Sequence, residues 1–164
     1  MDAIKLLKQQ HDEVGSLFKK FEEAEEDSEK QGIFEAIADT LAAHATIEEK
    51  VFYPAAYRDG EEEIEDLLRE ALEEHLGAKR IIADLIDMKA GDESFDAKMK
   101  VLQEQIEHHV EEEEGELFLK AKKEIAAEDL EAMGVEMEEM FEALIGTNPR
   151  MEVPSETEEA APLE

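Results

Sequence analysis

The segment "HATIEEKVFYP" places His44 and Glu48 one helical turn apart within a largely apolar stretch. Side chains separated by four residues lie on the same face of a helix. A second segment, "HHVEEEEGELF", repeats the spacing with His109 and Glu113. Imidazole nitrogens and carboxylate oxygens suit iron, manganese or zinc better than calcium or magnesium. Both segments are therefore candidates for metal ligands.

Apolar residues recur at spacings of three and four along four segments, which predicts amphipathic helices. The first runs from Asp2 to about Asp27, and the other apolar stripes are Ile37 to Val51, Ile64 to Leu85 and Phe95 to Leu117. The connections are short, so neighbouring helices should run antiparallel. We expect an all-α fold, an up-down-up-down four-helix bundle with an additional short C-terminal helix.

Each of the four apolar stripes contains one histidine at a core position. In an antiparallel pair, two residues lie at the same height when the midpoint of their positions falls on the connecting turn. The midpoints of successive histidine pairs fall between Asp27 and Ser28, between Asp59 and Gly60, and on Asp92. The spacing therefore predicts four histidines in one layer of the core.

The sequence also contains an internal repeat. Aligning His44 with His109 aligns Glu48 with Glu113 without a gap, and a nearly equal shift aligns "QQHDEV" with "EEHLGA". The repeat predicts a two-fold pseudo-symmetry that relates the first two helices to the last two.

A single histidine on an apolar helix face is usually a core residue with a satisfied hydrogen bond, but this cluster also buries two carboxylates. Burying a carboxylate without an opposite charge nearby costs roughly several kcal/mol, so a cation should lie between the two carboxylates. A carboxylate has two oxygens and can bridge two ions, and the absence of Cys excludes thiolate ligands. We predict a two-metal site with the ligands His11, His44, Glu48, His75, His109 and Glu113.

This set of residues resembles the hemerythrin family, and specifically its bacterial HHE cation-binding domains. The resemblance covers roughly residues 1–125 and implies a four-helix bundle that holds a non-haem di-iron centre, bridged by oxo or hydroxo groups and carboxylates. It implies that His11 and His44 hold one iron ion and that His75 and His109 hold the other. The small ligands it implies are O₂, peroxide and nitric oxide.

One position departs from the pattern of oxygen-carrying hemerythrins, which have a second histidine one turn after the third-helix ligand. Here that position is Lys79. An open metal position makes peroxide breakdown easier to envisage than simple oxygen carriage. Tyr53, Tyr57, His108 and Glu114 are the candidates for an extra ligand or for hydrogen-bond partners around the site. A peroxidase-like or catalase-like enzyme, and a zinc-binding or metal-free structural bundle, stay open as alternatives.

The rest of the chain follows the predicted bundle of residues 1–125. Residues 126–146 form an amphipathic, Met-rich segment that either folds back over the bundle or offers a surface to a second copy or another protein. Residues 147–164 are acidic and contain Pro, which predicts a disordered tail.

The chain of 164 residues carries 47 acidic and 17 basic residues, for a net charge of −30. This charge repels nucleic acids and anionic lipids, so we expect neither as a partner. The sequence has no apolar run near the ~20 residues needed to span a bilayer and no signal-peptide pattern at "MDAIKLLKQQ". We therefore expect a cytoplasmic protein.

Overall fold

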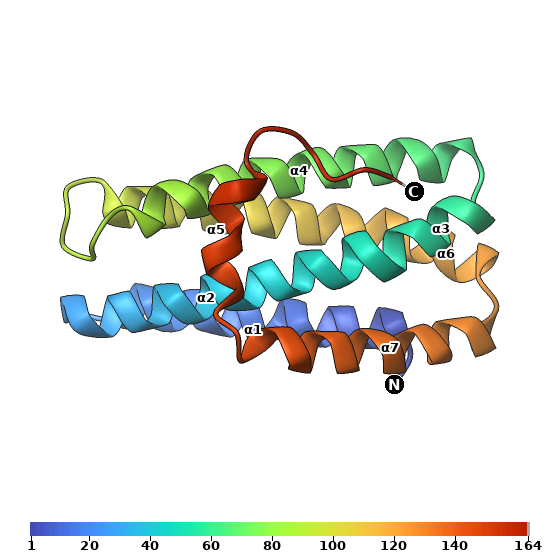
Figure 1. Cartoon of the computed structure of the whole chain (residues 1–164), viewed down its shortest axis with the longest axis horizontal. Coiled ribbons are helices and arrows are strands. Elements are labelled where there is room, and N and C mark those ends of the chain that lie inside the picture. The colour runs from blue at the N-terminus through green and yellow to red at the C-terminus, as the bar shows by residue number, and fades with distance from the viewer. Residues whose placement is uncertain (164) are drawn as a thin grey trace.

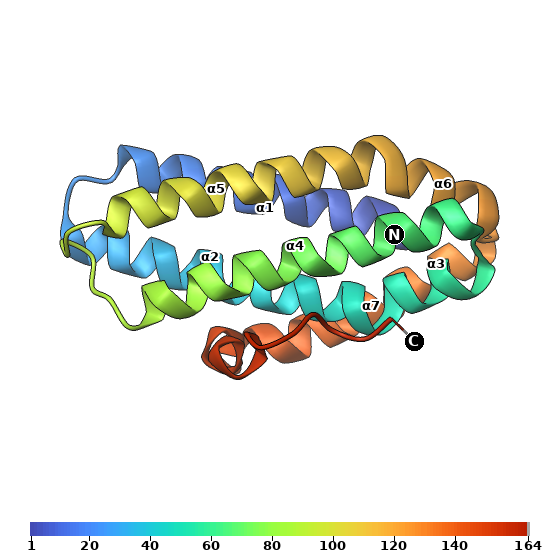
Figure 2. The ribbon, with the colours of Figure 1, turned by 90° about the horizontal axis from the view of Figure 1, so that it is seen from above.

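A computed structural model describes residues 1–163, and every regular element in this range is a helix. The all-helical class predicted from the sequence is confirmed. Four long helices lie along the long axis of the molecule, and successive ones run in opposite directions (Figures 1 and 2). They are α1 (Ala3–Glu23), α2 (Asp27–Ile47), α4 (Glu62–Ile86) and α5 (Phe95–Glu112).

The first helix is shorter than the sequence predicted. The Asp2 side chain caps its start by accepting a hydrogen bond from the Lys5 backbone N–H at 2.9 Å. It ends at Glu23 instead of about Asp27, and Asp27 begins α2. The reason lies in the run "EEAEED", where like charges one turn apart disfavour a helix and no large apolar residue continues the stripe after Phe21.

The second and fourth predicted helices each contain a wider π-helical turn. In the second, α2 is followed by η1 (Glu48–Phe52) and α3 (Tyr53–Asp59). In the fourth, α5 is followed by η2 (Glu113–Leu117) and α6 (Phe118–Glu124). Both π turns begin at the glutamate of a candidate ligand pair.

The buried apolar side chains form two clusters. One lies at the end of the bundle that includes Leu7, Leu68 and Phe118, and the other at the end that includes Phe34 and Leu102. Along each long helix the candidate histidine falls between residues of the first cluster and residues of the second. The histidine layer therefore sits at mid-height with an apolar layer on either side.

Helix α7 (Ala127–Ile145) folds back along the bundle and packs against α1 and α2 (Figure 1). Its Leu130, Met133 and Met137 are buried in the apolar cluster that includes Leu7. The Met-rich face is thus used inside the chain. Gly134 lies on the same face, where the N-terminal backbone approaches it closely.

The expectation of a disordered tail is contradicted within residues 147–163. Pro149–Glu156 forms a 3₁₀ helix, η3, that crosses α2 and α4 at a steep angle (Figure 1). Val153 is only 1% exposed, and Arg150 pairs with Asp39 at 2.8 Å. These two anchors hold a segment whose overall composition resembles that of a disordered chain. Glu164 lies outside the described residues.

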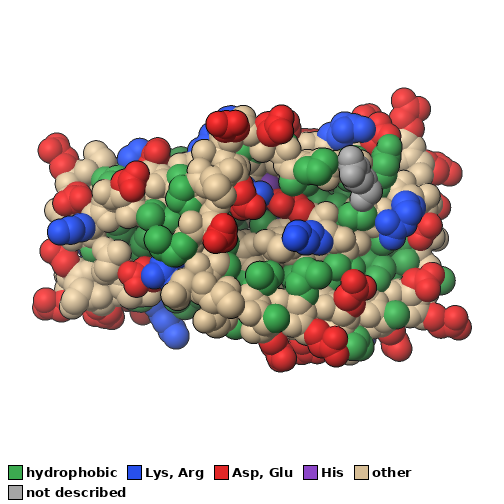
Figure 3. Space-filling model, in the orientation of Figure 1, with side chains coloured by type: hydrophobic (Ala, Val, Ile, Leu, Met, Phe, Trp, Pro, Cys, Tyr) green, Lys and Arg blue, Asp and Glu red, His purple; other side chains and the backbone are tan. Residues whose placement is uncertain are grey.

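Acidic side chains are spread over the face of the molecule shown in Figure 3, with far fewer Lys and Arg side chains among them. Within residues 1–163, no helix combines the length and the apolar character needed to cross a membrane.

We predict that Gly134→Ala destabilises the protein by about 1–3 kcal/mol, because an added methyl group would overlap the backbone of Met1 and Asp2. Gly15→Ala is the matched control, since it lies on an exposed face of α1 with no atom near the added methyl group. The control should gain up to about 1 kcal/mol from helix propensity. Thermal unfolding of both variants checks the pair, and a Gly134→Ala variant as stable as the wild type would contradict the observed packing.

Candidate metal centre

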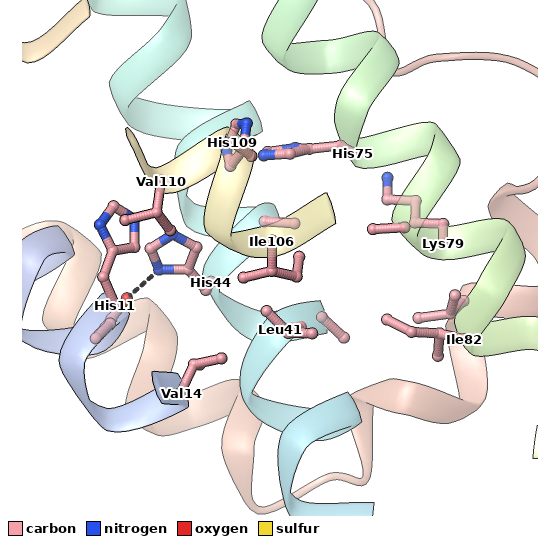
Figure 4. Close-up of a pocket in the computed structure, with 15 residues that line it drawn as sticks. His11, Val14, Leu41, His44, His75, Lys79, Ile82, Ile106, His109 and Val110 are labelled. Atoms are coloured by element: carbon pink, nitrogen blue, oxygen red, sulfur yellow. Dashed lines mark hydrogen bonds between the residues drawn. The ribbon is translucent and has the colours of Figure 1, made fainter. Parts of the chain in front are cut away.

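Four of the five histidines come together in the core, one from each long helix. His11 lies on α1, His44 on α2, His75 on α4 and His109 on α5, and all are buried. Their rings form two neighbouring pairs: the centroids of His11 and His44 are 4.9 Å apart, as are those of His75 and His109 (Figure 4).

Two buried glutamates connect these histidine pairs. Glu48 Oε1 lies 3.1 Å from His44 Nε2 and 3.2 Å from His75 Nε2. Glu113 Oε1 lies 3.1 Å from His11 Nε2, and its Oε2 lies 3.3 Å from His109 Nε2. Each carboxylate therefore faces one histidine from each pair.

Each ring is oriented by a hydrogen bond from its outer nitrogen, Nδ1. The acceptors are Glu114 for His11 at 2.6 Å, Gln10 for His44 at 2.7 Å, Glu49 for His75 at 2.7 Å and Glu74 for His109 at 2.7 Å. Carboxylate and amide oxygens only accept, so Nδ1 is the donor in every pair. Every Nε2 consequently faces the centre, as in metal sites where a carboxylate or amide fixes the ligating ring.

Several of the inward-facing atoms have no hydrogen-bond partner. They are the Nε2 atoms of His11, His44 and His109, both carboxylate oxygens of Glu48 and Oε1 of Glu113. A buried polar atom without a partner costs about 1–3 kcal/mol, and more when it is charged. Donor atoms of His11, His44, Glu48 and Glu113 lie within 4.8 Å of one another, as do those of Glu48, His75 and His109. The arrangement fits two cations that share Glu48.

The charges in the centre shift the pKa values of its groups. Burial alone would raise the pKa of Glu113, but the attraction of His109 and the nearby imidazole of His11 hold this pKa well below its usual range. Burial likewise opposes the charged form of His109, yet Glu113 holds the pKa of this imidazole well above its usual value. In the absence of a cation, a proton on His109 therefore compensates the Glu113 carboxylate, and a bound cation would replace it.

Tyr53 is the one candidate extra ligand whose oxygen reaches the inward-facing atoms. Its buried hydroxyl donates to Glu113 Oε2 at 2.5 Å and lies 3.3 Å from His75 Nε2. Burial and the negative charges of Glu113 and Glu48 raise the pKa of this phenol well above its usual value. Tyr53 is therefore a protonated hydrogen-bond donor when no cation is present.

The other three candidates lie elsewhere. Glu114 is the hydrogen-bond partner of His11 and lies outside the set of inward-facing atoms. His108 is largely exposed and faces Glu112 at 3.0 Å and Glu74 at 3.6 Å. Tyr57 is partly buried and packs against the apolar cluster that includes Leu68.

The π turns were missed by the sequence reasoning, although the internal repeat places both at equivalent positions. Such turns are rare and occur frequently at functional sites. Each is followed by an aromatic ring that stacks on a histidine: Tyr53 on His75 at 5.5 Å and Phe118 on His11 at 5.9 Å, measured between ring centroids. The repeat aligns these two aromatic residues, and only Tyr53 brings a hydroxyl group.

The outer hydrogen-bond partners Gln10, Glu49 and Glu74 were also missed. A signal was available, because each is the sequence neighbour of a candidate ligand, as Glu114 is. Lys79, noted from the sequence only as a missing histidine, is buried, and its Nζ lies 3.2 Å from Glu49. It neutralises the carboxylate that orients His75.

Comparison with known proteins supports this description. The sequence profile of the hemerythrin HHE cation-binding domain matches residues 2–121, which ends before α7 and η3. A search of curated proteins finds no match. A similar solved structure is that of a hemerythrin HHE cation-binding domain-containing protein, an Rv2633c homologue from Mycobacterium kansasii. It has a TM-score of 0.77 and 23% identity over 90% of this chain and 89% of that chain, a likeness of fold.

We predict that the chelator-treated protein loses stability as the pH rises above 6.5, the ordinary pKa of a histidine side chain. Burial opposes the charged form of the imidazoles, but the neighbouring carboxylates outweigh this effect and raise the pKa of His11, His75 and His109 above 6.5. The stability that these protonated histidines contribute is therefore fully present below pH 6.5 and is lost as the pH rises through their pKa values in the folded protein. The lowered pKa of Glu113 affects stability only at acid pH, because the stability that its ionised carboxylate contributes is lost as the pH falls below 4.5.

Metal binding should reverse this trend near neutral pH, because ligating histidines must be free of a proton on Nε2. Melting temperatures of the metal-loaded and chelated protein between pH 5.5 and 8.5 check the prediction. A chelated protein that becomes more stable over this range would contradict the charge arrangement described here.

Proposed function

The chain belongs to the hemerythrin HHE cation-binding domain family, and from this premise we propose that it is a non-haem di-iron protein that binds or reacts with O₂, peroxide or nitric oxide. One observation carries the proposal. Four imidazole nitrogens and two carboxylates point inward at one height of an apolar bundle, and six of their atoms lack a hydrogen-bond partner.

The geometry supports a division of the ligands between two ions. His11 and His44 would hold one ion and His75 and His109 the other, because the rings of each pair lie side by side. Glu48 and Glu113 would bridge, since each faces one histidine of both pairs. When bound, two iron ions supply Lewis acidity and redox chemistry to a small ligand.

The residues around the ions would have distinct tasks. The four outer hydrogen bonds hold the imidazoles in place, so that the ligand geometry is set before a small molecule arrives. The apolar clusters above and below exclude water. Tyr53 offers a hydroxyl oxygen beside His75, where it would serve as an additional ligand and make the two ion positions unequal.

A peroxidase-like or catalase-like enzyme is the second candidate. It is favoured by Lys79, which stands where oxygen carriers have a further histidine and whose Nζ is engaged with Glu49. Turnover of hydrogen peroxide that is lost in Glu48→Ala would support the enzyme. A reversible spectral change with gas and no turnover would support a sensor or store, and zinc or no metal would support a structural bundle.

We predict about two iron ions per chain after expression with iron, with absorption bands of oxo-bridged ferric iron. Glu113→Gln should lower the iron content, because one bridging oxygen becomes an amide that ligates weakly. Glu111→Gln is the matched control, since Glu111 is exposed on α5. Elemental analysis and visible spectra check both variants. A wild-type protein with well under one iron per chain would overturn the proposal.

We predict that Tyr53→Phe keeps most of the iron but changes the visible spectrum. If the Tyr53 oxygen ligates ferric iron, the phenolate-to-iron charge-transfer band of the wild type should disappear in this variant. Tyr57→Phe is the control, because Tyr57 packs against the apolar cluster away from the histidines. Identical spectra of the iron-loaded wild type and Tyr53→Phe would leave Tyr53 as a hydrogen-bond donor to Glu113 only.

A further inference from the structure

A small cavity of about 40 Å³ adjoins the candidate centre on the side of Val14 and Ile82. The edges of His11, His44, His75 and His109 form one side of it (Figure 4). The other walls are almost entirely apolar, with Leu41, Ile106 and Val153 among them. One water-sized ligand needs roughly 10–15 Å³, so the cavity has room for a ligand of about two or three heavy atoms.

One residue of the cavity wall, Val153, comes from η3, and the others come from the four long helices. Helices α2 and α4 make few contacts with each other, and η3 packs across both of them (Figure 1). Val153 lies at the centre of η3, is 1% exposed and lines the cavity. Without this segment, the gap between α2 and α4 would open the histidine layer to solvent.

Polar contacts hold both ends of the segment. At its start, the Arg150 backbone N–H and guanidinium donate to the two carboxylate oxygens of Asp39 at 3.1 and 2.8 Å. At its end, Arg80 donates to the carbonyl oxygens of Thr157 at 3.0 Å and Glu158 at 3.3 Å. One anchor lies on α2 and the other on α4, so the segment acts as a strap between these helices.

Lys79 connects the strap to the ligand environment. Its Nζ lies 3.9 Å from Glu156 of η3 and 3.2 Å from Glu49, which orients His75. Lys79 also lines the cavity. The rim beside Val153 therefore carries one cation paired with two carboxylates, while the interior stays apolar.

We infer that Val153 is a specificity-determining residue: it narrows the cavity beside the centre, so that ligands of two heavy atoms enter more readily than ligands of three. The inference rests on the proposed function for the identity of those ligands, namely O₂, nitric oxide or hydrogen peroxide. Val153 is suited to this task because its branched side chain is rigid and is held by a segment anchored at both ends.

The test measures association of nitric oxide and of the longer azide ion with iron-loaded protein by stopped-flow absorbance. Val153→Ala should accelerate azide association roughly tenfold and nitric oxide association much less, so the ratio of the two rates rises. Met151→Ala is the matched control, because Met151 lies on the same 3₁₀ helix and is 57% exposed. Arg150→Ala should accelerate both ligands by loosening the strap.

A second measurement does not depend on iron. Xenon enters apolar cavities, and the ¹²⁹Xe chemical shift of dissolved gas should change more with metal-free Val153→Ala than with metal-free wild type or Met151→Ala. An unchanged rate ratio at full iron content, or an unchanged xenon shift in Val153→Ala, would overturn the role of Val153. Absence of iron in the wild type would instead overturn the proposed function. The xenon comparison would then still test whether Val153 forms part of the cavity wall.

Discussion

The structure depends on the burial of two carboxylates and four imidazoles in one layer of an apolar bundle. Glu48 and Glu113 are 0% and 2% exposed, and the histidines 6–9%. Such groups are stable in the core only if opposite charges or cations face them. Helix register, the outer hydrogen bonds and the π turns all act to bring the inward-facing atoms together. A one-residue slip of any long helix would turn its histidine away from the centre and leave the remaining charges unpaired.

The two-fold pseudo-symmetry extends beyond the candidate ligands and is broken at particular places. Glu49 and Glu114 are equivalent and orient equivalent histidines, His75 and His11. In the other equivalent pair the partners differ, because Gln10 accepts a hydrogen bond from His44 whereas Glu74 accepts one from His109. A carboxylate increases the basicity of the imidazole it binds more than an amide does, so His109 should be a stronger donor than His44. Tyr53 and Phe118 break the symmetry in the same half, because only the half with His75 and His109 receives a hydroxyl oxygen.

The sequence predicted those features that follow from periodicity. The histidines and their glutamates lie on the apolar stripes, so helix geometry alone indicated a common layer. The outer partners were missed because Gln10, Glu49 and Glu74 lie beside the stripe, where charged residues usually face solvent. The π turns were missed because no residue preference distinguishes them from ordinary helix. The strap was missed because the overall composition of this acidic segment hides the few residues that anchor it, among them Arg150 and Val153.

The strap covers one side of the candidate centre, where η3 packs across α2 and α4. Helices α2 and α4 contact each other at few positions. The short 3₁₀ helix that covers the gap between them is held by arginine contacts at its two ends and by the buried Pro149 and Val153. Local opening costs less free energy where few apolar contacts are broken. We therefore expect any local opening to begin at the strap and not in the four long helices. Lys79 links the two, since it pairs with Glu49 on one side and Glu156 on the other.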